Sequence, residues 1–440
     1  MFTMKEKELY ILMFKDFEVL SFSVDFEKEY IELVEKLEHF DKAPFGINND
    51  TKEINFAITN FFGSRMIDYN RLDFPQIMSA TGCKSAFELA FKGHGLSLSN
   101  HYWFRKPNEN LKYEDINLFT NKWDDSFARA VLSKDYEKLK NCDLNVPDLF
   151  TEGWGIKGWI YDNGPKLYKL GIHDGNEECV GEVLSSRLAA RLFAEDECLK
   201  YELKQWDKEL VSVCSPIITF DEELIPLSNV LMPELYSLYR NRTANKLSGK
   251  QFFEQLKNFK EIDLTEFFIK ISVLRDLCFA SDIHFGNIGV IRNLKTGELK
   301  VAPIYDLGSS FGSSRTAKSF MENLSKSTMF LIYFIFNDLD PDWDYSWYNP
   351  DKLIGFEDEI VEYLSKSEFY TPEKIDAIID VYHHQKSILD GYASKAINEG
   401  GNCNEAFHSP DCCPDCGSKN VEYYWGGNLR CKDCGCVFPE

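Results

Sequence analysis

Residues 281–308 read SDIHFGNIGVIRNLKTGELKVAPIYDLG, and this stretch is the most informative part of the chain about its fold. An apolar run follows Asn287, a turn containing Gly297 interrupts it, and a second apolar run leads to Asp306. Two apolar runs around a short glycine-containing turn are typical of a β-hairpin. Because a hairpin brings its two ends together, the sequence predicts that Asp306 lies beside Asn287.

The hairpin groups three side chains that carry oxygen. Asp282 precedes Asn287 by five residues, which is the spacing in protein kinases between the catalytic aspartate and a metal-binding asparagine. Amide and carboxylate oxygens suit Mg²⁺ that bridges nucleotide phosphates. We therefore expect Asn287 and Asp306 to bind Mg²⁺ and Asp282 to accept a proton. The alternative, in which Asp282 caps a turn and Asp306 ends a surface strand, explains each residue singly but not the joint pattern.

This segment resembles the HipA-like serine/threonine kinases, whose catalytic loop reads Asp-Arg-His-x-x-Asn and whose metal motif reads Pro-x-(Tyr/Phe)-Asp. Residues 303–306, Pro-Ile-Tyr-Asp, match the metal motif, and Asp282, His284 and Asn287 match the catalytic loop. Ile283 replaces the usual arginine, which leaves open how the loop is braced. The resemblance implies a catalytic loop that includes His284.

The resemblance covers about residues 60 to 395 and implies a phosphate-binding lysine on a strand, paired with a glutamate on the next helix. Lys169, in the alternating run KLYKLG, and Glu182, early in the following apolar-periodic segment, are the matching residues. Glu177 and Glu178 compete with Glu182 for that role. A fixed cation stabilises negative charge that develops on phosphate oxygens.

A glycine-rich turn precedes the strand of Lys169. Gly153, Gly155 and Gly158 fit the pattern G-x-G-x-x-G between two expected antiparallel strands, which residues 162–164 join as a turn. The pattern does not open a helix within a βαβ unit, so a dinucleotide-binding fold is disfavoured. We expect a loop that covers nucleotide phosphates, and an ordinary hairpin turn is the alternative.

A different metal-binding pattern ends the chain. Seven of the 13 cysteines lie between residues 403 and 436, and in a chain without an export signal such a cluster indicates metal binding rather than disulfides. Two C-x₂-C-G knuckles separated by 14 residues supply four thiolates: Cys413, Cys416, Cys431 and Cys434. Four thiolates complete the shell of a structural Zn²⁺ ion, so we predict a zinc ribbon with a hairpin that turns at residues 426–427.

The remaining patterns define the expected architecture. Strands are predicted at 10–14 and 17–22, an acidic helix at 26–40, and helices over 178–193, over 264–279 and from Thr371 onward. We expect an α+β, two-lobed, protein-kinase-like fold. Its parts are an N-terminal α/β subdomain (1–120), a kinase N-lobe (121–230), a largely helical C-lobe with the catalytic loop (231–397), a linker (398–411) and the zinc ribbon (412–440).

Charge and hydropathy indicate the surroundings in which the protein is expected to work. The net charge of −22 disfavours non-specific binding to nucleic acids and to anionic membranes. No apolar run approaches the roughly 20 residues that span a bilayer, and the N-terminus does not resemble a signal peptide. We therefore expect a soluble, cytoplasmic protein.

These features favour a phosphotransferase that depends on ATP and Mg²⁺. The resemblance implies a serine/threonine protein kinase with a protein substrate, a cognate antitoxin or regulator, and a toxin-like or defence role. Autophosphorylation is a further hypothesis, because hydroxyl side chains crowd just past Asp306 and Thr151 lies beside the glycine-rich turn; the candidates are Thr151, Ser309, Ser310, Ser313, Ser314 and Thr316. Two alternatives stay open: a kinase-derived binding protein whose ribbon recognises protein or nucleic acid, and a kinase of small molecules or lipids.

Overall fold

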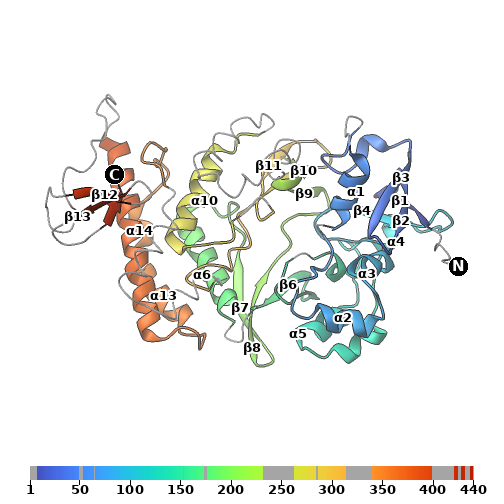
Figure 1. Ribbon diagram of the computed structural model, residues 1–440, viewed down its shortest axis with the longest axis horizontal. Helices are drawn as coiled ribbons and strands as arrows, with labels where there is room; N and C mark the ends of the chain where they lie inside the picture. Colours follow the sequence, from blue (N-terminus) through green and yellow to red (C-terminus); the bar gives the residue numbers. More distant parts are fainter. Residues whose placement is uncertain are drawn as a thin grey trace. The chain divides into compact units, whose positions relative to one another are not determined.

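The computed structural model describes residues 7–48, 53–63, 65–151, 153–172, 176–230, 262–283, 286–313, 339–398, 421–424, 428–431 and 437–439. The chain divides into two compact units, Met1–Ala393 and Ser394–Glu440. The described part of the first unit mixes α-helices with β-sheets (Figure 1). Within the described residues, no helix is both long enough and apolar enough to cross a bilayer.

The N-terminal subdomain is built on an antiparallel sheet of order β3-β2-β1-β4. Its strands are β1 (Glu8–Phe14), β2 (Phe17–Asp25), β3 (Tyr30–Lys36) and β4 (Tyr102–Arg105). Its helices are α1 (Ile54–Gly63), α2 (Phe74–Thr81), α3 (Ala86–Lys92), α4 (Tyr113–Ile116) and α5 (Ser126–Leu132). The two strands predicted at 10–14 and 17–22 are confirmed as β1 and β2.

The helix predicted over residues 26–40 is wrong, because its middle forms strand β3. Ile31 is fully buried opposite Val24 of β2, and Leu33 pairs with Phe22. Ile31 and its apolar neighbours are as well suited to a half-buried strand as to a helix face. Pairing with the edge of β2 decides between the two, and a local pattern cannot show that pairing.

The next sheet carries Lys169 and has the order β5-β6-β8-β7. Its strands are β5 (Lys157–Tyr161), β6 (Pro165–Leu170), β7 (Tyr201–Trp206) and β8 (Glu209–Cys214). The predicted hairpin of β5 and β6 is present, and its turn contains Asn163 and Gly164 at positive φ angles of 51° and 116°. The helix expected after β6 is α6 (Glu177–Leu192), which packs against β7 and β8.

One apolar core joins the N-terminal subdomain to this sheet. Leu12 and Phe104 of the N-terminal sheet belong to the same buried cluster as Ile160, Tyr168 and Val213. Helix α5 contributes to the junction, because it packs on β5. The N-terminal subdomain and strands β5, β6 and β8 therefore share one continuous hydrophobic interior.

The hairpin predicted after Asn287 is present as β10 (Gly289–Asn293) and β11 (Leu299–Val301). It forms a sheet of order β11-β10-β9 with β9 (Glu222–Pro226). The accompanying helices are α7 (Leu227–Val230), α10 (Thr265–Cys278), α13 (Phe356–Leu364) and α14 (Pro372–Asn398). The predicted helices at 264–279 and after Thr371 are thereby confirmed, and α10 lies beside α6 (Figure 1).

Short 3₁₀ helices connect several elements: Phe40–Lys42, Tyr136–Asn141, Pro147–Phe150 and Pro350–Leu353. The second unit contains an antiparallel sheet of order β12-β13-β14. Its strands are β12 (Val421–Tyr424), β13 (Asn428–Cys431) and β14 (Val437–Pro439). The hairpin expected between the cysteine knuckles is therefore present as β12 and β13.

Candidate active site

A cavity of about 740 Å³, here called the central cavity, gathers most of the predicted site residues. Its walls come from the β5–β8 sheet, α6, strand β9, the loops that flank the β10–β11 hairpin, and the N-terminal subdomain. The predicted residues that line it are Gly153, Gly155, Lys169, Glu182, Asp282, Asn287 and Asp306. Side chains separated by more than 100 residues in the sequence thus face one space.

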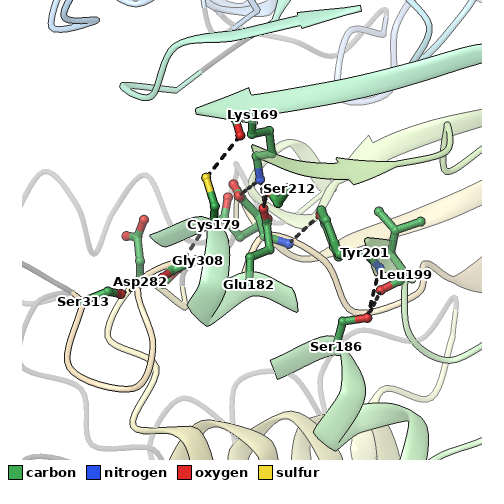
Figure 2. Close-up of polar contacts among 12 residues, drawn as sticks. Lys169, Cys179, Glu182, Ser186, Leu199, Tyr201, Ser212, Asp282, Gly308 and Ser313 are labelled. Atoms are coloured by element: carbon green, nitrogen blue, oxygen red, sulfur yellow. Dashed lines mark hydrogen bonds and ion pairs between the residues drawn. The ribbon is translucent and has the colours of Figure 1, made fainter. Parts of the chain in front are cut away.

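Lys169 contacts two carboxylates in this cavity. Its Nζ donates to Oε1 of Glu182 and to Oδ1 of Asp306, the second at 2.5 Å. Figure 2 shows Lys169 extending from its strand to Glu182 on the helix opposite. The side chains of Lys169 and Glu182 are 13% and 3% exposed, so this ion pair is largely shielded from solvent.

The charge of Lys169 is fixed by this arrangement. Burial by itself lowers the pKa of an ammonium group. Here the carboxylates of Asp306 and Glu182 outweigh burial, and the pKa of Lys169 lies above its usual value. Lys169 is therefore a permanent cation at any physiological pH.

Glu182 is held by neighbours on the sheet. Ser212 of β8, which pairs with Lys169 across the ladder, donates its hydroxyl to Oε2 of Glu182 at 2.5 Å. The competing Glu178 also lines the cavity, but its carboxylate accepts from the backbone N–H of Ile172 at 3.1 Å. The structure therefore pairs Lys169 with Glu182.

Asp306 has an unusual backbone conformation. Its φ angle is 61°, in the left-handed region that residues other than glycine rarely adopt. Its backbone N–H donates to the hydroxyl oxygen of Tyr201 at 3.3 Å, and the neighbouring Ile304 pairs with Cys198. Strain of this kind persists where surrounding contacts fix it, and it is concentrated at functional sites.

The loop that carries Asn287 and the end of the hairpin come together as predicted. The hydroxyl of Tyr305, next to Asp306, donates to the backbone oxygen of Gly286, next to Asn287, at 3.2 Å. Nδ2 of Asn287 donates to the backbone oxygen of Asp282 at 3.0 Å. This contact uses the nitrogen of the Asn287 amide and leaves its oxygen as the atom for a cation.

The donor set fits a magnesium ion. Asp306 offers a carboxylate that is 38% exposed at the cavity, and Asn287 offers an amide oxygen. Two protein oxygens on one side match the preference of Mg²⁺ for few protein ligands, with water and phosphate oxygens completing the octahedron. The chemistry of these two groups therefore suits Mg²⁺.

The loop after Asp306 packs tightly on α6. A side chain at Gly181 would place its Cβ 3.0 Å from the backbone oxygen of Gly308 and 3.0 Å from Oγ of Ser310. Ser185 donates to Ser310 at 2.8 Å in the same buried contact. The absence of a side chain at Gly181 lets the helix that carries Glu182 approach the loop that carries Asp306.

The three glycines of the G-x-G-x-x-G pattern have different surroundings. Gly153 has a φ of 109°, and a Cβ there would lie 2.6 Å from Nζ of Lys157. Gly155 also lines the central cavity. Gly158 does not, since it lies in β5 and a Cβ there would be 2.8 Å from Cβ of Ala128. Gly158 therefore serves the packing of β5 on α5.

Lys157 is a cavity cation that the sequence reasoning missed. It pairs with Lys169 across β5 and β6, and both side chains line the central cavity. Burial lowers the pKa of Lys157 to about 8, although the Asp306 carboxylate opposes that change. Lys157 could have been found from the sequence, because it occupies the last variable position of the G-x-G-x-x-G pattern.

The candidate phosphorylation sites differ in access. Thr151 and Ser309 line the central cavity. Ser310 and Ser313 are fully buried, and Ser313 donates to the backbone oxygen of Gly308 at 2.7 Å. Ser314 and Thr316 lie outside the described residues. Among the described candidates, only Thr151 and Ser309 face the site.

Several predicted residues fall outside the described part of the chain. These are His284, Cys413, Cys416 and Cys434, and of Cys431 only the backbone is described, in β13. Where side chains are described, no three His, Cys, Asp or Glu residues are grouped to hold a metal ion. The zinc site therefore stays a prediction from the sequence.

No protein-family model and no curated protein sequence matches the chain. Among solved structures, the proinflammatory kinase CtkA of Helicobacter pylori is 19% identical, with a TM-score of 0.42, and the match covers 57% of this chain and 93% of CtkA. A chain from the HipA–HipB toxin–antitoxin complex of Shewanella oneidensis MR-1 with its operator DNA is 10% identical, with a TM-score of 0.48, covering 88% of this chain and 97% of that one. At such identities, function is inferred from the chain's own residues.

Proposed function

We propose that this protein is a phosphotransferase that uses ATP and Mg²⁺ and acts as a serine/threonine protein kinase. The observation that carries the proposal is the contact of Lys169 with both Glu182 and Asp306, inside a cavity that Asp282 and Asn287 also line. A buried cation beside two oxygen ligands suits a triphosphate with its metal ion. Taken singly, each of these residues has an ordinary structural explanation, but their convergence on one cavity does not.

The proposed roles follow from charge and position. Asn287 and Asp306 hold Mg²⁺, which neutralises charge on the phosphate oxygens. Lys169 contacts the phosphates as a fixed cation, and Glu182 keeps its ammonium group in place. The turn at Gly153 and Gly155 covers the nucleotide from the side of β5.

Asp282 is the proposed base. Its exposed side chain, labelled in Figure 2, lines the cavity. The oxygen of the acceptor hydroxyl forms a bond to the γ-phosphorus of ATP, and the bond between that phosphorus and the β,γ-bridging oxygen breaks. ADP carries away the electron pair of the broken bond, and the hydroxyl proton passes to the carboxylate of Asp282.

Incubation of the purified protein with ATP labelled at the γ-phosphate tests this function. We expect label transfer that requires Mg²⁺, to proteins of an added lysate and to Thr151 or Ser309 of the chain itself, because both line the cavity. Label in lipids or small molecules instead would favour the alternative acceptor classes. Absence of both Mg²⁺-dependent ATP binding and transfer would contradict the proposal.

We also propose that the second unit binds one zinc ion per chain through Cys413, Cys416, Cys431 and Cys434. Cys431 ends strand β13 of an antiparallel hairpin, as the spacing of the knuckles requires. Residues 394–440 form a unit of their own, so loss of the metal is expected to leave residues 1–393 folded. The charge of residues 411–440 is −2, which favours protein contact over nucleic-acid binding for this ribbon.

Replacing Cys431 with serine is expected to remove the zinc, because three thiolates and a hydroxyl no longer complete a stable tetrahedral shell. Elemental analysis of the purified protein measures the effect, from one zinc per chain to none. Cys436→Ser is the matched control and should retain its zinc, since Cys436 lies outside both knuckles. A Cys431→Ser protein with a full equivalent of zinc would show that the ligands lie elsewhere.

A further inference from the structure

The wall of the central cavity opposite the β5–β8 sheet contains an arginine that the proposed chemistry does not use. Arg65 follows helix α1 in the N-terminal subdomain and lines the cavity together with Phe61, Asn100 and Phe150. Its Nη2 donates to Oδ1 of Asn100 at 3.0 Å. The guanidinium lies 4.5 Å from the ring centre of Phe61 and 5.4 Å from that of Phe150. Two rings and an amide therefore hold one cation at the cavity wall.

No carboxylate in the described part of the chain neutralises Arg65 by an ion pair. The charge of Glu223 acts on the pKa of Arg65, but the carboxylate of Glu223 is already bound by Arg292 at 2.5 Å. Asp68 also lines the cavity, and its carboxylate accepts instead from the backbone and side chain of Asn70. Two guanidinium groups thus share one buried carboxylate, which leaves Arg65 without a carboxylate of its own among the described residues.

Without a bound ligand, the buried position of Arg65 disfavours its positive charge. Burial lowers the pKa of Arg65 to about 10, and Glu223 only partly opposes that change. A desolvated guanidinium gains most from a planar anion that accepts two parallel hydrogen bonds. A ligand carboxylate would supply this contact.

Arg65 is separate from the cations of the phosphate site. Arg65 lies just after helix α1, whereas Lys157 and Lys169 lie on strands β5 and β6. Arg65 also belongs to a different part of the fold, since the two lysines are neighbours on β5 and β6. The cavity therefore has cations on two different parts of its wall, and the proposed function uses only those on β5 and β6.

We propose that Arg65 binds a carboxylate group of the molecule that accepts the phosphoryl group. This inference rests on the proposed function, because it assigns a substrate class to the same cavity. A carboxylate is favoured over a phosphate because Asp68 and Glu223 line the same space, and a group with a single negative charge is repelled less than a dianion. The overall charge of −22 likewise disfavours a polyanionic acceptor. The carboxylate belongs either to an acidic side chain near the phosphorylated hydroxyl of a peptide or to a small hydroxy acid.

Matched acceptors test the proposal. One arm compares mixed serine- and threonine-containing peptides that carry glutamate next to the hydroxyl residue with the same peptides carrying glutamine. The other arm compares N-acetylserine with its amide. We expect kcat/KM to be about tenfold to a hundredfold higher for the charged member of at least one pair, the range for a hydrogen-bonded charged group. The arm that shows the preference identifies the source of the carboxylate.

Variants of Arg65 connect the preference to this side chain. Arg65→Gln should remove the preference for the charged acceptor and leave the affinity for ATP within about twofold. Arg65→Lys should restore part of the preference, because it returns the charge without the planar fork. Arg129→Gln is the matched control, since Arg129 is half-exposed, pairs with Asp125 and does not line the cavity.

Acceptor binding measured by calorimetry with a non-hydrolysable ATP analogue makes the test independent of turnover. Tighter binding of the charged acceptor by the wild type, lost in Arg65→Gln, would support the inference even if no transfer were seen. Equal binding of charged and neutral acceptors, or a preference that survives in Arg65→Gln, would overturn it. Failure of the proposed function would look different, because ATP itself would then not bind in a Mg²⁺-dependent manner.

Discussion

Phosphoryl transfer by an Asp306→Asn protein is expected to be about a hundred to a thousand times slower than by the wild type. Asparagine keeps the size of the side chain and one oxygen, but it removes the charge that contacts Lys169 and would bind Mg²⁺. The initial rate of label transfer, measured over a range of Mg²⁺ concentrations, checks this result. Loss of a metal ligand should also raise the Mg²⁺ concentration needed for half-maximal rate.

Asp282→Asn should be distinguishable from Asp306→Asn in the same assay. Removal of a general base slows transfer by about 10²- to 10⁴-fold, but the Mg²⁺ requirement should stay as in the wild type. Asp41→Asn serves as the control, because Asp41 is an exposed residue outside the central cavity. An Asp306→Asn protein that transferred phosphate at the wild-type rate would show that the metal assignment is wrong.

Replacing Lys169 with methionine is expected to affect both activity and stability. The change removes the cation that contacts both Glu182 and Asp306, and it leaves Glu182 buried with Ser212 as its partner. Removal of one partner of a buried ion pair costs about 3 kcal/mol or more, and the exposure of Asp306 favours the lower value. Transfer should fall at least about a hundredfold, because phosphate charge is then uncompensated.

The stability deficit of Lys169→Met should depend on pH. In the wild type the pKa of Lys169 is raised, so its stabilising contribution is complete below its usual pKa of 10.5 and is lost only as pH rises through the raised value. In the variant, protonation of the orphaned carboxylates at low pH relieves their repulsion. Urea unfolding should therefore show a larger deficit at pH 8 than at pH 5. Lys166→Met, on the same strand and outside the cavity, is the control, and equal deficits at both pH values would contradict the ion-pair explanation.

The sequence predicts best what depends on neighbours along the chain. The β10–β11 hairpin, the β5–β6 hairpin and helix α6 were all recognisable from local patterns and turn residues. Strand β3 was mistaken for a helix because its pairing with β2 is not local. The antitoxin or regulator, the acceptor and the roles of His284 and the four cysteines stay predictions.

The site residues that the sequence did not predict are brought there by segments that lie far apart in the chain. Ser212 reaches Glu182 only because β8 pairs with β6, and Tyr201 reaches Asp306 only through the packing of β7 on the loop after the hairpin. Arg65 belongs to the cavity because the loop that contains Ser99 lies against β9, more than 120 residues later in the chain. No spacing rule connects such distant segments, so only the folded chain reveals them.

The apolar core that joins the N-terminal sheet to the strands of Lys169 also has a consequence for how mutations act. A shared interior makes the two regions melt as one cooperative transition, as is usual for elements that bury each other's surface. A cavity-forming substitution at Phe104, remote in sequence from every catalytic residue, would therefore lower the fraction of molecules that are folded and competent. Each molecule that remains folded would still catalyse the reaction at the normal rate. In an assay of total activity, the smaller amount of folded protein would look like slower catalysis.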